Sequence, residues 1–138
     1  MSEMRFHQEN LVLLNRRIEV LSIGLSPKEL KNLSGSVGFE QAIRIRSCEQ
    51  IEEVLESIPA GSMNLAVVSG TGDKNRIRWT LRWLKHRWPN CLNVVVGQDE
   101  QIARENGAMF FSGTMSEYEG RSILDGARQL RQAKVTSA

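Results

Sequence analysis

The residues best suited to chemistry lie in a short loop that follows a predicted buried strand. Ser69-Gly70-Thr71-Gly72-Asp73-Lys74 combines hydroxyls, glycines, a carboxylate and an amine. Backbone amides at the start of a helix can hold an anion. The spacing does not match the G-x-x-x-x-G-K-S/T pattern of phosphate-binding loops. The sequence therefore favours an ordinary loop between strand and helix, with Asp73 as a solvated residue at the helix start.

A helix predicted from about Asn75 to Trp88 carries a second set of distinctive side chains. No acidic residue occurs from 74 to 98, and the basic residues of this stretch are Lys74, Arg76, Arg78, Arg82, Lys85 and Arg87. One helical face is apolar and is expected to pack on a sheet; it consists of Ile77, Leu81, Leu84 and Trp88. The other face carries a candidate partner surface, made of Trp79, Trp83 and His86 and flanked by Arg78 and Arg82.

Three interpretations of this second face remain open. In the first, the tryptophans lie partly covered beneath neighbouring segments. In the second they form a protein interface, because Trp and Arg are enriched at binding hot spots. In the third, basic groups meet phosphates while aromatic rings stack on nucleic-acid bases. An aromatic stripe outside the buried face favours the protein interface.

Length and composition indicate one globular domain. The 138 residues are 41% hydrophobic and 25% charged, and 18 basic against 16 acidic residues leave a net charge of +2. That charge is too small to imply a nucleic-acid partner by itself. No apolar run approaches the length of a membrane span, and the first residues lack the basic-then-apolar order of a signal peptide. A cytoplasmic location without membrane contact is predicted.

The residues that commonly bind metals or cofactors are sparse. Cys48 and Cys91 lie outside any CxxC spacing and are expected to be reduced, small apolar side chains. His7 and His86 are too few and too far apart to form a metal site. The turn at 24–27 is too short for the phosphate loop of a flavin site. The sequence therefore predicts no metal and no cofactor.

Strand-like and helix-like segments alternate along most of the chain. The predicted strands are 18–23, 42–46, 65–68, 94–97 and 109–111, and a helix follows each. Capping boxes open three of these helices: Ser26 with Glu29, Ser47 with Gln50, and Ser116 with Glu119. This alternation predicts an α/β fold, a doubly wound parallel sheet with helices on both faces. We expect an N-terminal arm or short helix at 1–16, the domain at 17–132 and a flexible tail at 133–138.

Several short motifs follow one another in a familiar order. The first strand leads into a turn that ends at Pro27, and the later motifs are Gly38-Phe39-Glu40, Trp88-Pro89 and Gly107-Ala108 with Phe110 or Phe111 beyond. Over roughly 17–130 this order resembles the receiver domains of response regulators. The resemblance implies a flavodoxin-like (βα)₅ fold with strand order 2-1-3-4-5.

The same resemblance implies a phosphoacceptor pocket, and here the sequence departs from the family. Receiver domains place an acidic pair for Mg²⁺ after strand one, an acceptor aspartate after strand three, and a hydroxyl and a lysine after strands four and five. The matching positions here are Gly24, Leu25, Ser69, Gly97 and Thr114, or Gly113 if the last register shifts by one. Mg²⁺ requires carboxylates, and a serine without an adjacent base is a poor nucleophile. The pocket is predicted to be degenerate.

The sequence thus predicts a non-enzymatic pseudo-receiver. It would act in two-component-type signal transduction by protein–protein interaction, with a protein partner or as a homodimer. The alternative function is a nucleic-acid-binding regulator that uses the basic aromatic helix at 74–88.

Overall fold

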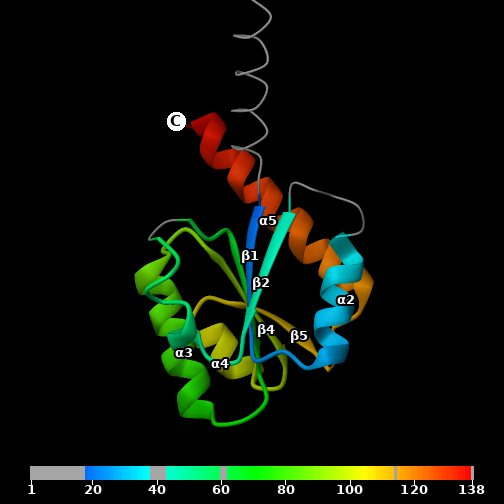
Figure 1. Cartoon of the computed structure of the whole chain (residues 1–138), viewed down its shortest axis with the longest axis vertical. Helices are drawn as coiled ribbons and strands as arrows, with labels where there is room; N and C mark the ends of the chain where they lie inside the picture. Colours follow the sequence, from blue (N-terminus) through cyan, green and yellow to red (C-terminus); the bar gives the residue numbers. More distant parts are fainter. Residues whose placement is uncertain (1–17, 38–42, 60–61, 114, 138) are drawn as a thin grey trace, which may run out of the picture.

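A five-stranded parallel sheet forms the centre of the computed structural model (Figure 1). The structure describes residues 18–37, 43–59, 62–113 and 115–137, with side chains for all of these except 36, 37 and 130–137. The strands are β1 (Ile18–Ile23), β2 (Ile43–Cys48), β3 (Leu65–Ser69), β4 (Leu92–Gly97) and β5 (Met109–Ser112). Their order is β2-β1-β3-β4-β5, and every neighbouring pair is parallel. The predicted doubly wound fold is confirmed.

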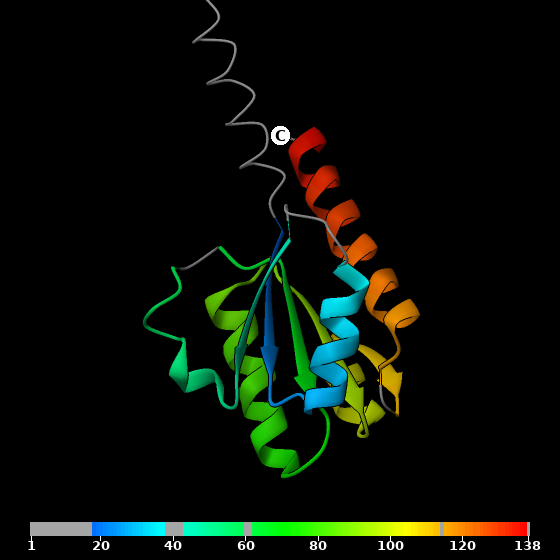
Figure 2. The same ribbon diagram turned by 45° about the vertical axis from the view of Figure 1, so that its right-hand side comes forward.

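Helices cover both faces of the sheet (Figure 2). One face carries α3 (Lys74–Arg87), α4 (Glu100–Glu105) and the short 3₁₀ helix η1 (Ile51–Glu53); the other carries α2 (Pro27–Val37) and α5 (Glu117–Ser137). All five residues of β3 are buried, and alternate side chains point into the two hydrophobic layers. Four consecutive apolar residues, Leu65 to Val68, suit a central parallel strand that is covered on both faces. None of the described helices combines the length and apolar character needed to cross a membrane.

Local sequence signals account for three of the helix starts. The Ser26 Oγ accepts a hydrogen bond from Glu29 N at 3.2 Å, and the Glu29 carboxylate accepts one from Ser26 N at 3.0 Å. Ser116 and Glu119 form the same reciprocal pair at the start of α5. The Asp73 carboxylate caps α3 by accepting from Asn75 N at 2.9 Å. These caps confirm the helix starts that the sequence predicted.

The predicted helix after β2 is wrong. β2 continues to Cys48, the capping box shifts to Gln50 with Glu53, and only the single turn of η1 follows. The described chain therefore has four α-helices and not five. The cause is a tertiary contact, in which two side chains at the end of α3 donate hydrogen bonds to carbonyl oxygens of this segment. Arg87 donates to Ile58 O at 2.8 Å, and the Trp88 indole donates to Pro59 O at 2.9 Å.

The sequence predicted an arm at the start of the chain and a flexible tail at its end. The arm at 1–16 lies outside the described residues. α5 runs to Ser137, so it includes most of the segment predicted as a tail. The flexibility of 133–138 stays a prediction.

We expect Trp88→Phe to destabilise the domain by about 1–3 kcal/mol, because it removes a buried indole and its hydrogen bond to Pro59. Trp88 is fully buried. Trp83→Phe is the matched control and should change the free energy of unfolding by less than about 0.5 kcal/mol, since that ring is exposed. Chemical denaturation measures both. Equal losses of unfolding free energy in the two variants would show that the hydrogen bond from Trp88 to Pro59 does not stabilise the segment after β2.

Candidate functional site

Three of the five predicted pocket residues come together at the carboxyl edge of the sheet. Gly24 follows β1, Ser69 ends β3 and Gly97 ends β4. A Cβ placed on Gly24 would lie 3.6 Å from the Ser69 Cβ, and one on Gly97 would lie 3.5 Å from the Thr71 methyl. Parallel strands bring their carboxyl ends to one edge, and ligands of open α/β sheets bind there. Gly24, Ser69 and Gly97 therefore lie at one edge of the sheet, and their assignment to a degenerate acceptor pocket stays a prediction.

The two hydroxyl side chains at this edge are hydrogen-bonded to each other. The Ser69 and Thr71 hydroxyls lie 2.8 Å apart, and Thr71 N donates to the Ser69 Oγ at 3.3 Å. Leu25 is buried among the apolar residues between the sheet and the α2–α5 layer. Leu25, which the resemblance assigned to a metal-ligand position, therefore packs in the core. Thr114 lies outside the described residues.

The loop after Ser69 is held tightly against the end of β4. Gly70 N donates to Val96 O at 2.7 Å, and a Cβ on Gly70 would lie 2.3 Å from Gln98 O. No side chain fits at that distance, so this position requires glycine. Gly70, the first glycine of the sequence that suggested a phosphate loop, thus serves backbone packing.

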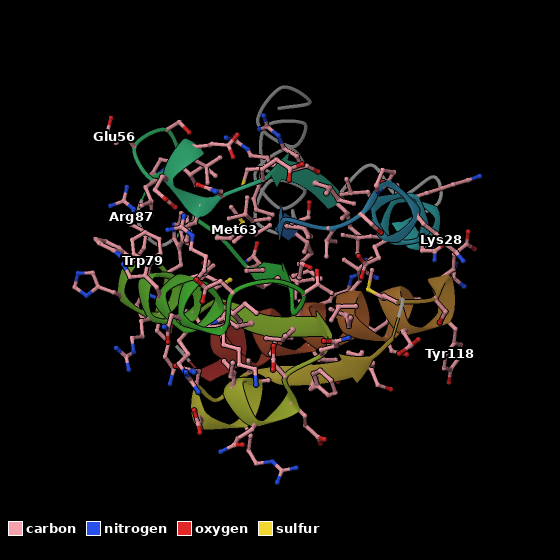
Figure 3. The ribbon with its side chains drawn as sticks, turned by 90° about the horizontal axis from the view of Figure 1, so that it is seen from below. Lys28, Glu56, Met63, Trp79, Arg87 and Tyr118 are labelled. Carbon is pink, nitrogen blue, oxygen red and sulfur yellow. The ribbon has the colours of Figure 1, made fainter. Side chains whose placement is uncertain are left out.

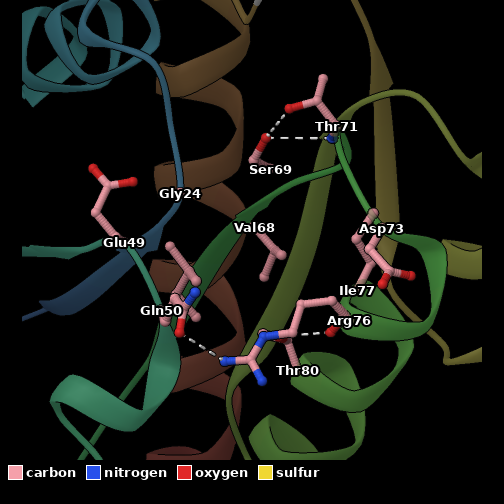
Figure 4. A pocket seen from close by; sticks show the side chains of 11 residues that line it. Gly24, Glu49, Gln50, Val68, Ser69, Thr71, Asp73, Arg76, Ile77 and Thr80 are labelled. Atoms are coloured by element: carbon pink, nitrogen blue, oxygen red, sulfur yellow. Dashed lines mark hydrogen bonds between the residues drawn. The ribbon is translucent and has the colours of Figure 1, made fainter.

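A pocket of about 240 Å³ lies beside these strand ends, between β1, β2, β3 and the first turns of α3 (Figure 4). Its polar walls include the hydroxyls of Ser69, Thr71 and Thr80, the carboxylates of Glu49 and Asp73, and the Arg76 guanidinium. The lining holds two acidic residues and one arginine, and that arginine is paired with Glu52, so the pocket has no excess positive charge for an anion. Among the described residues, no group of three His, Cys, Asp or Glu side chains is arranged to hold a metal ion.

Arg76 is the electrostatic anchor of this region. Its guanidinium binds the Glu52 carboxylate, lies 3.4 Å from the Gln50 side-chain oxygen, and has its centre 4.4 Å from the Trp79 ring centroid. The hydrogen bond from Arg76 lowers the pKa of the Glu52 carboxyl. Arg76 therefore joins the η1 segment to α3 across 24 residues of sequence.

Cys48, at the end of β2, is a free thiol beside this region. Burial, with a smaller effect of nearby glutamates, raises its pKa to about 12. A thiol with such a pKa is not a nucleophile at neutral pH. Cys91 is also free.

The predicted apolar face of α3 is confirmed, whereas the two tryptophans of its aromatic face differ in burial. Ile77, Leu81, Leu84 and Trp88 are all buried. Trp79 is half-buried and packs against the hydrophobic layer beside α3, whereas the Trp83 side chain is 37% exposed. The Trp79 and Trp83 ring centroids lie 5.7 Å apart, and Trp83 and His86 lie 5.9 Å apart. The expectation that both tryptophans lie outside the core is therefore wrong for Trp79, and for Trp83 it stays a prediction.

The arginines of the candidate partner surface lie on the other flank of α3. Arg78 Nε is 3.8 Å from a Glu105 carboxylate oxygen on α4, so this flank faces α4. Arg82 and Lys85 follow Arg78 by four and seven residues, which places them along the same flank. Both are exposed, and neither takes part in an ion pair found among the described residues.

The sequence analysis missed an acidic segment beside α3. Glu49, Glu52, Glu53 and Glu56 are all exposed. The signal was present in the sequence, since four glutamates within eight residues precede a long stretch without acids. Their position along α3 depends on the contacts of Arg76 and Arg87.

Comparison with known proteins identifies the fold. No family model and no curated protein matches the chain. Among solved structures, it is similar to a response regulator receiver domain protein from Clostridium thermocellum, with a TM-score of 0.66, 13% identity, and coverage of 84% of this chain and 98% of that one. A CheY-like protein, TadZ, from Pseudomonas aeruginosa has a TM-score of 0.63 and 18% identity over 80% and 99% of the two chains.

A third similar structure has a different name. The adenylate cyclase from Rhodopirellula baltica matches with a TM-score of 0.68 and 12% identity, over 88% of this chain and 94% of that one. Proteins with different names thus share this architecture at low identity, and a fold alone does not specify a function. The chain has a receiver-like fold, and its function is inferred from its own residues.

We expect the two tryptophan truncations to differ. Trp79→Ala should cost about 2 kcal/mol, less than the roughly 3–5 kcal/mol for a fully buried ring, because Trp79 is half-buried beneath Arg76. Trp83→Ala should cost less than about 1 kcal/mol, as at ordinary surface positions. Urea denaturation of each variant tests this. A larger loss for Trp83 would mean that its ring is a core element.

Proposed function

We propose that this chain is a receiver-like signalling module that acts by protein contact and carries no phosphoryl group. The observation that supports this most directly is the neutral carboxyl edge of the sheet. Gly24 and Gly97 have no side chain there, Leu25 is buried in the core, and Ser69 is hydrogen-bonded to Thr71. Phosphoryl transfer to a receiver requires a carboxylate acceptor and metal-binding carboxylates at these positions.

The nearby carboxylates already have other roles. Asp73 caps α3, and Asp99 lies 3.7 Å from the Lys74 amine. Glu49 lines the pocket from the end of β2, on the side of β1 away from β4. None of these groups stands at the end of β1 or β3, where the metal ligand and the acceptor are needed. On these grounds the proposal includes no enzymatic activity.

Protein contact is favoured over nucleic-acid binding by the surroundings of α3. Glu52 neutralises Arg76, Glu105 pairs with Arg78, and further exposed glutamates lie on the neighbouring η1 segment. Phosphate backbones would meet these carboxylates beside the basic groups, which costs electrostatic free energy. The exposed Trp83 and His86, in contrast, suit a protein interface. Binding of labelled DNA and RNA at low and moderate salt tests the alternative.

We expect incubation with a small-molecule phosphodonor and Mg²⁺ to leave the mass of the protein unchanged. The physical reason is the missing carboxylates at Gly24, Leu25 and Ser69. The Ser69→Asp variant should also stay unmodified, because it restores an acceptor without restoring the metal ligands. An active receiver domain serves as the positive control in the same mass spectrometry. An acid-labile adduct on the wild-type chain would overturn the proposed function.

We also expect the β4–β5 edge to have a single conformation. Receiver switching requires a hydroxyl at the position of Gly97, whose carbonyl here accepts a hydrogen bond from Gly113 N at 3.1 Å. Phe110 packs toward α3 and α4, and Phe111 packs toward α2 and α5. Aromatic relaxation dispersion with and without a phosphate mimic should show no exchange that responds to the mimic. Two populated states that do respond would argue for a working switch.

A further inference from the structure

The exposed surface of α3 and η1 has a charge pattern that its own copy would complement. We define the charged band as three parallel rows: an acidic edge of Glu52, Glu53 and Glu56, an aromatic centre of Trp79, Trp83 and His86, and a basic edge of Arg78, Arg82 and Lys85. Glu52 is paired with Arg76 and Arg78 with Glu105, so two carboxylates, Glu53 and Glu56, and two basic side chains, Arg82 and Lys85, lie outside these ion pairs. Figure 3 shows Glu56, Arg87 and Trp79 on the same side of the molecule.

Contacts on both flanks of α3 establish the order of the rows. Arg76 binds Glu52 and covers Trp79, so the acidic edge borders the aromatic centre. Arg87 binds Ile58 O, so the segment stays beside α3 as far as its last turn. Arg78 pairs with Glu105 on the opposite flank, toward α4. The aromatic centre therefore separates an acidic edge from a basic edge.

We propose that two copies of this chain associate through the charged band, with a twofold axis that lies in the interface, runs parallel to the three rows and passes near Trp83. A twofold axis brings the same patch of each copy face to face. It places the acidic edge of one copy on the basic edge of the other, twice, and stacks the aromatic centres. This inference rests on the proposed function, because it names the partner of the protein contact as a second copy.

The two edges make a second copy a better occupant than a partner of one charge. An acidic partner would meet Glu53 and Glu56 across the aromatic centre, and a basic partner would meet Arg82 and Lys85. Like charges brought together at an interface oppose binding. A nucleic acid is disfavoured for the same reason as an acidic protein. Only a partner surface that also carries an acidic edge and a separate basic edge can place opposite charges against both edges of the charged band.

The aromatic centre is expected to supply most of the affinity and the edges the orientation. Exposed ion pairs are weak individually, whereas Trp is a frequent hot-spot residue. Sedimentation velocity of the full chain over a concentration series measures the association. We expect a reversible dimer whose dissociation constant rises at least about tenfold in Trp83→Ala. Tyr118→Ala is the matched control, because Tyr118 is 81% exposed at the start of α5.

Charge reversal tests the geometry of the association. The basic-edge variant combines Arg82→Glu with Lys85→Glu, and the acidic-edge variant combines Glu53→Lys with Glu56→Lys. Each variant alone brings like charges together twice, so each should sediment as a monomer. An equimolar mixture should form a mixed dimer, because the reversed edges then face each other with opposite charges. Lys28→Glu with Lys31→Glu makes the same charge change on α2 and should still dimerise.

Each outcome decides the inference. Circular dichroism of every variant confirms folding, since Glu53 also forms the capping box of η1. Loss of the dimer in both variants and its return on mixing support the twofold geometry. A wild-type chain that stays monomeric at its highest soluble concentration overturns the inference, as does a dimer unaffected by these changes. Neither result would affect the proposed function, which fails instead on a phosphoryl adduct.

Discussion

α3 is attached on two sides, and much of the structure depends on this double attachment. One face buries four apolar side chains on the sheet, while Arg76, Arg87 and Trp88 hold the segment from Glu52 to Pro59. The segment does not form a regular helix, but two of its carbonyl oxygens accept hydrogen bonds from Arg87 and Trp88. Burial of a large aromatic side chain contributes a few kcal/mol to folding stability, which is more than one additional turn of helix would contribute. The same attachment forms the pocket wall and half-buries Trp79.

The carboxyl edge of the sheet has no carboxylate at Gly24, Leu25, Ser69 or Gly97. Clusters of buried carboxylates, as in phosphorylatable receivers, are costly unless a cation compensates them. Here the strand ends carry glycine and serine, so nothing requires compensation. The close approach of Gly70 to Gln98 and the Ser69–Thr71 pair close the edge with neutral hydrogen bonds, each of which contributes about 1 kcal/mol. A fold known for charge-driven switching has here an edge held by packing and neutral hydrogen bonds.

The small net charge of +2 conceals a strong separation of charge. Glutamates gather between 49 and 56, and basic residues gather between 74 and 87. The fold then places the two groups side by side on one face, with aromatic rings between them. Under the proposed protein contact, such a pattern would orient a partner and add little affinity, because each exposed ion pair contributes only about 0–1 kcal/mol and salt screens it. Any affinity must come from the exposed aromatic surface, of which Trp83 is the centre.

The sequence alone determined the features that depend on local pattern. Strand alternation, the apolar face of α3 and the caps at Ser26, Asp73 and Ser116 follow from hydrophobic spacing and side-chain hydrogen bonds within a few residues. The same is true of the strand ends, because a parallel sheet aligns them at one edge. Only the tertiary structure decided the conformation of residues 49–59, the half-burial of Trp79 and the pairing of Glu52 with Arg76. These depend on contacts between residues some 20 to 30 positions apart, which periodicity cannot reveal.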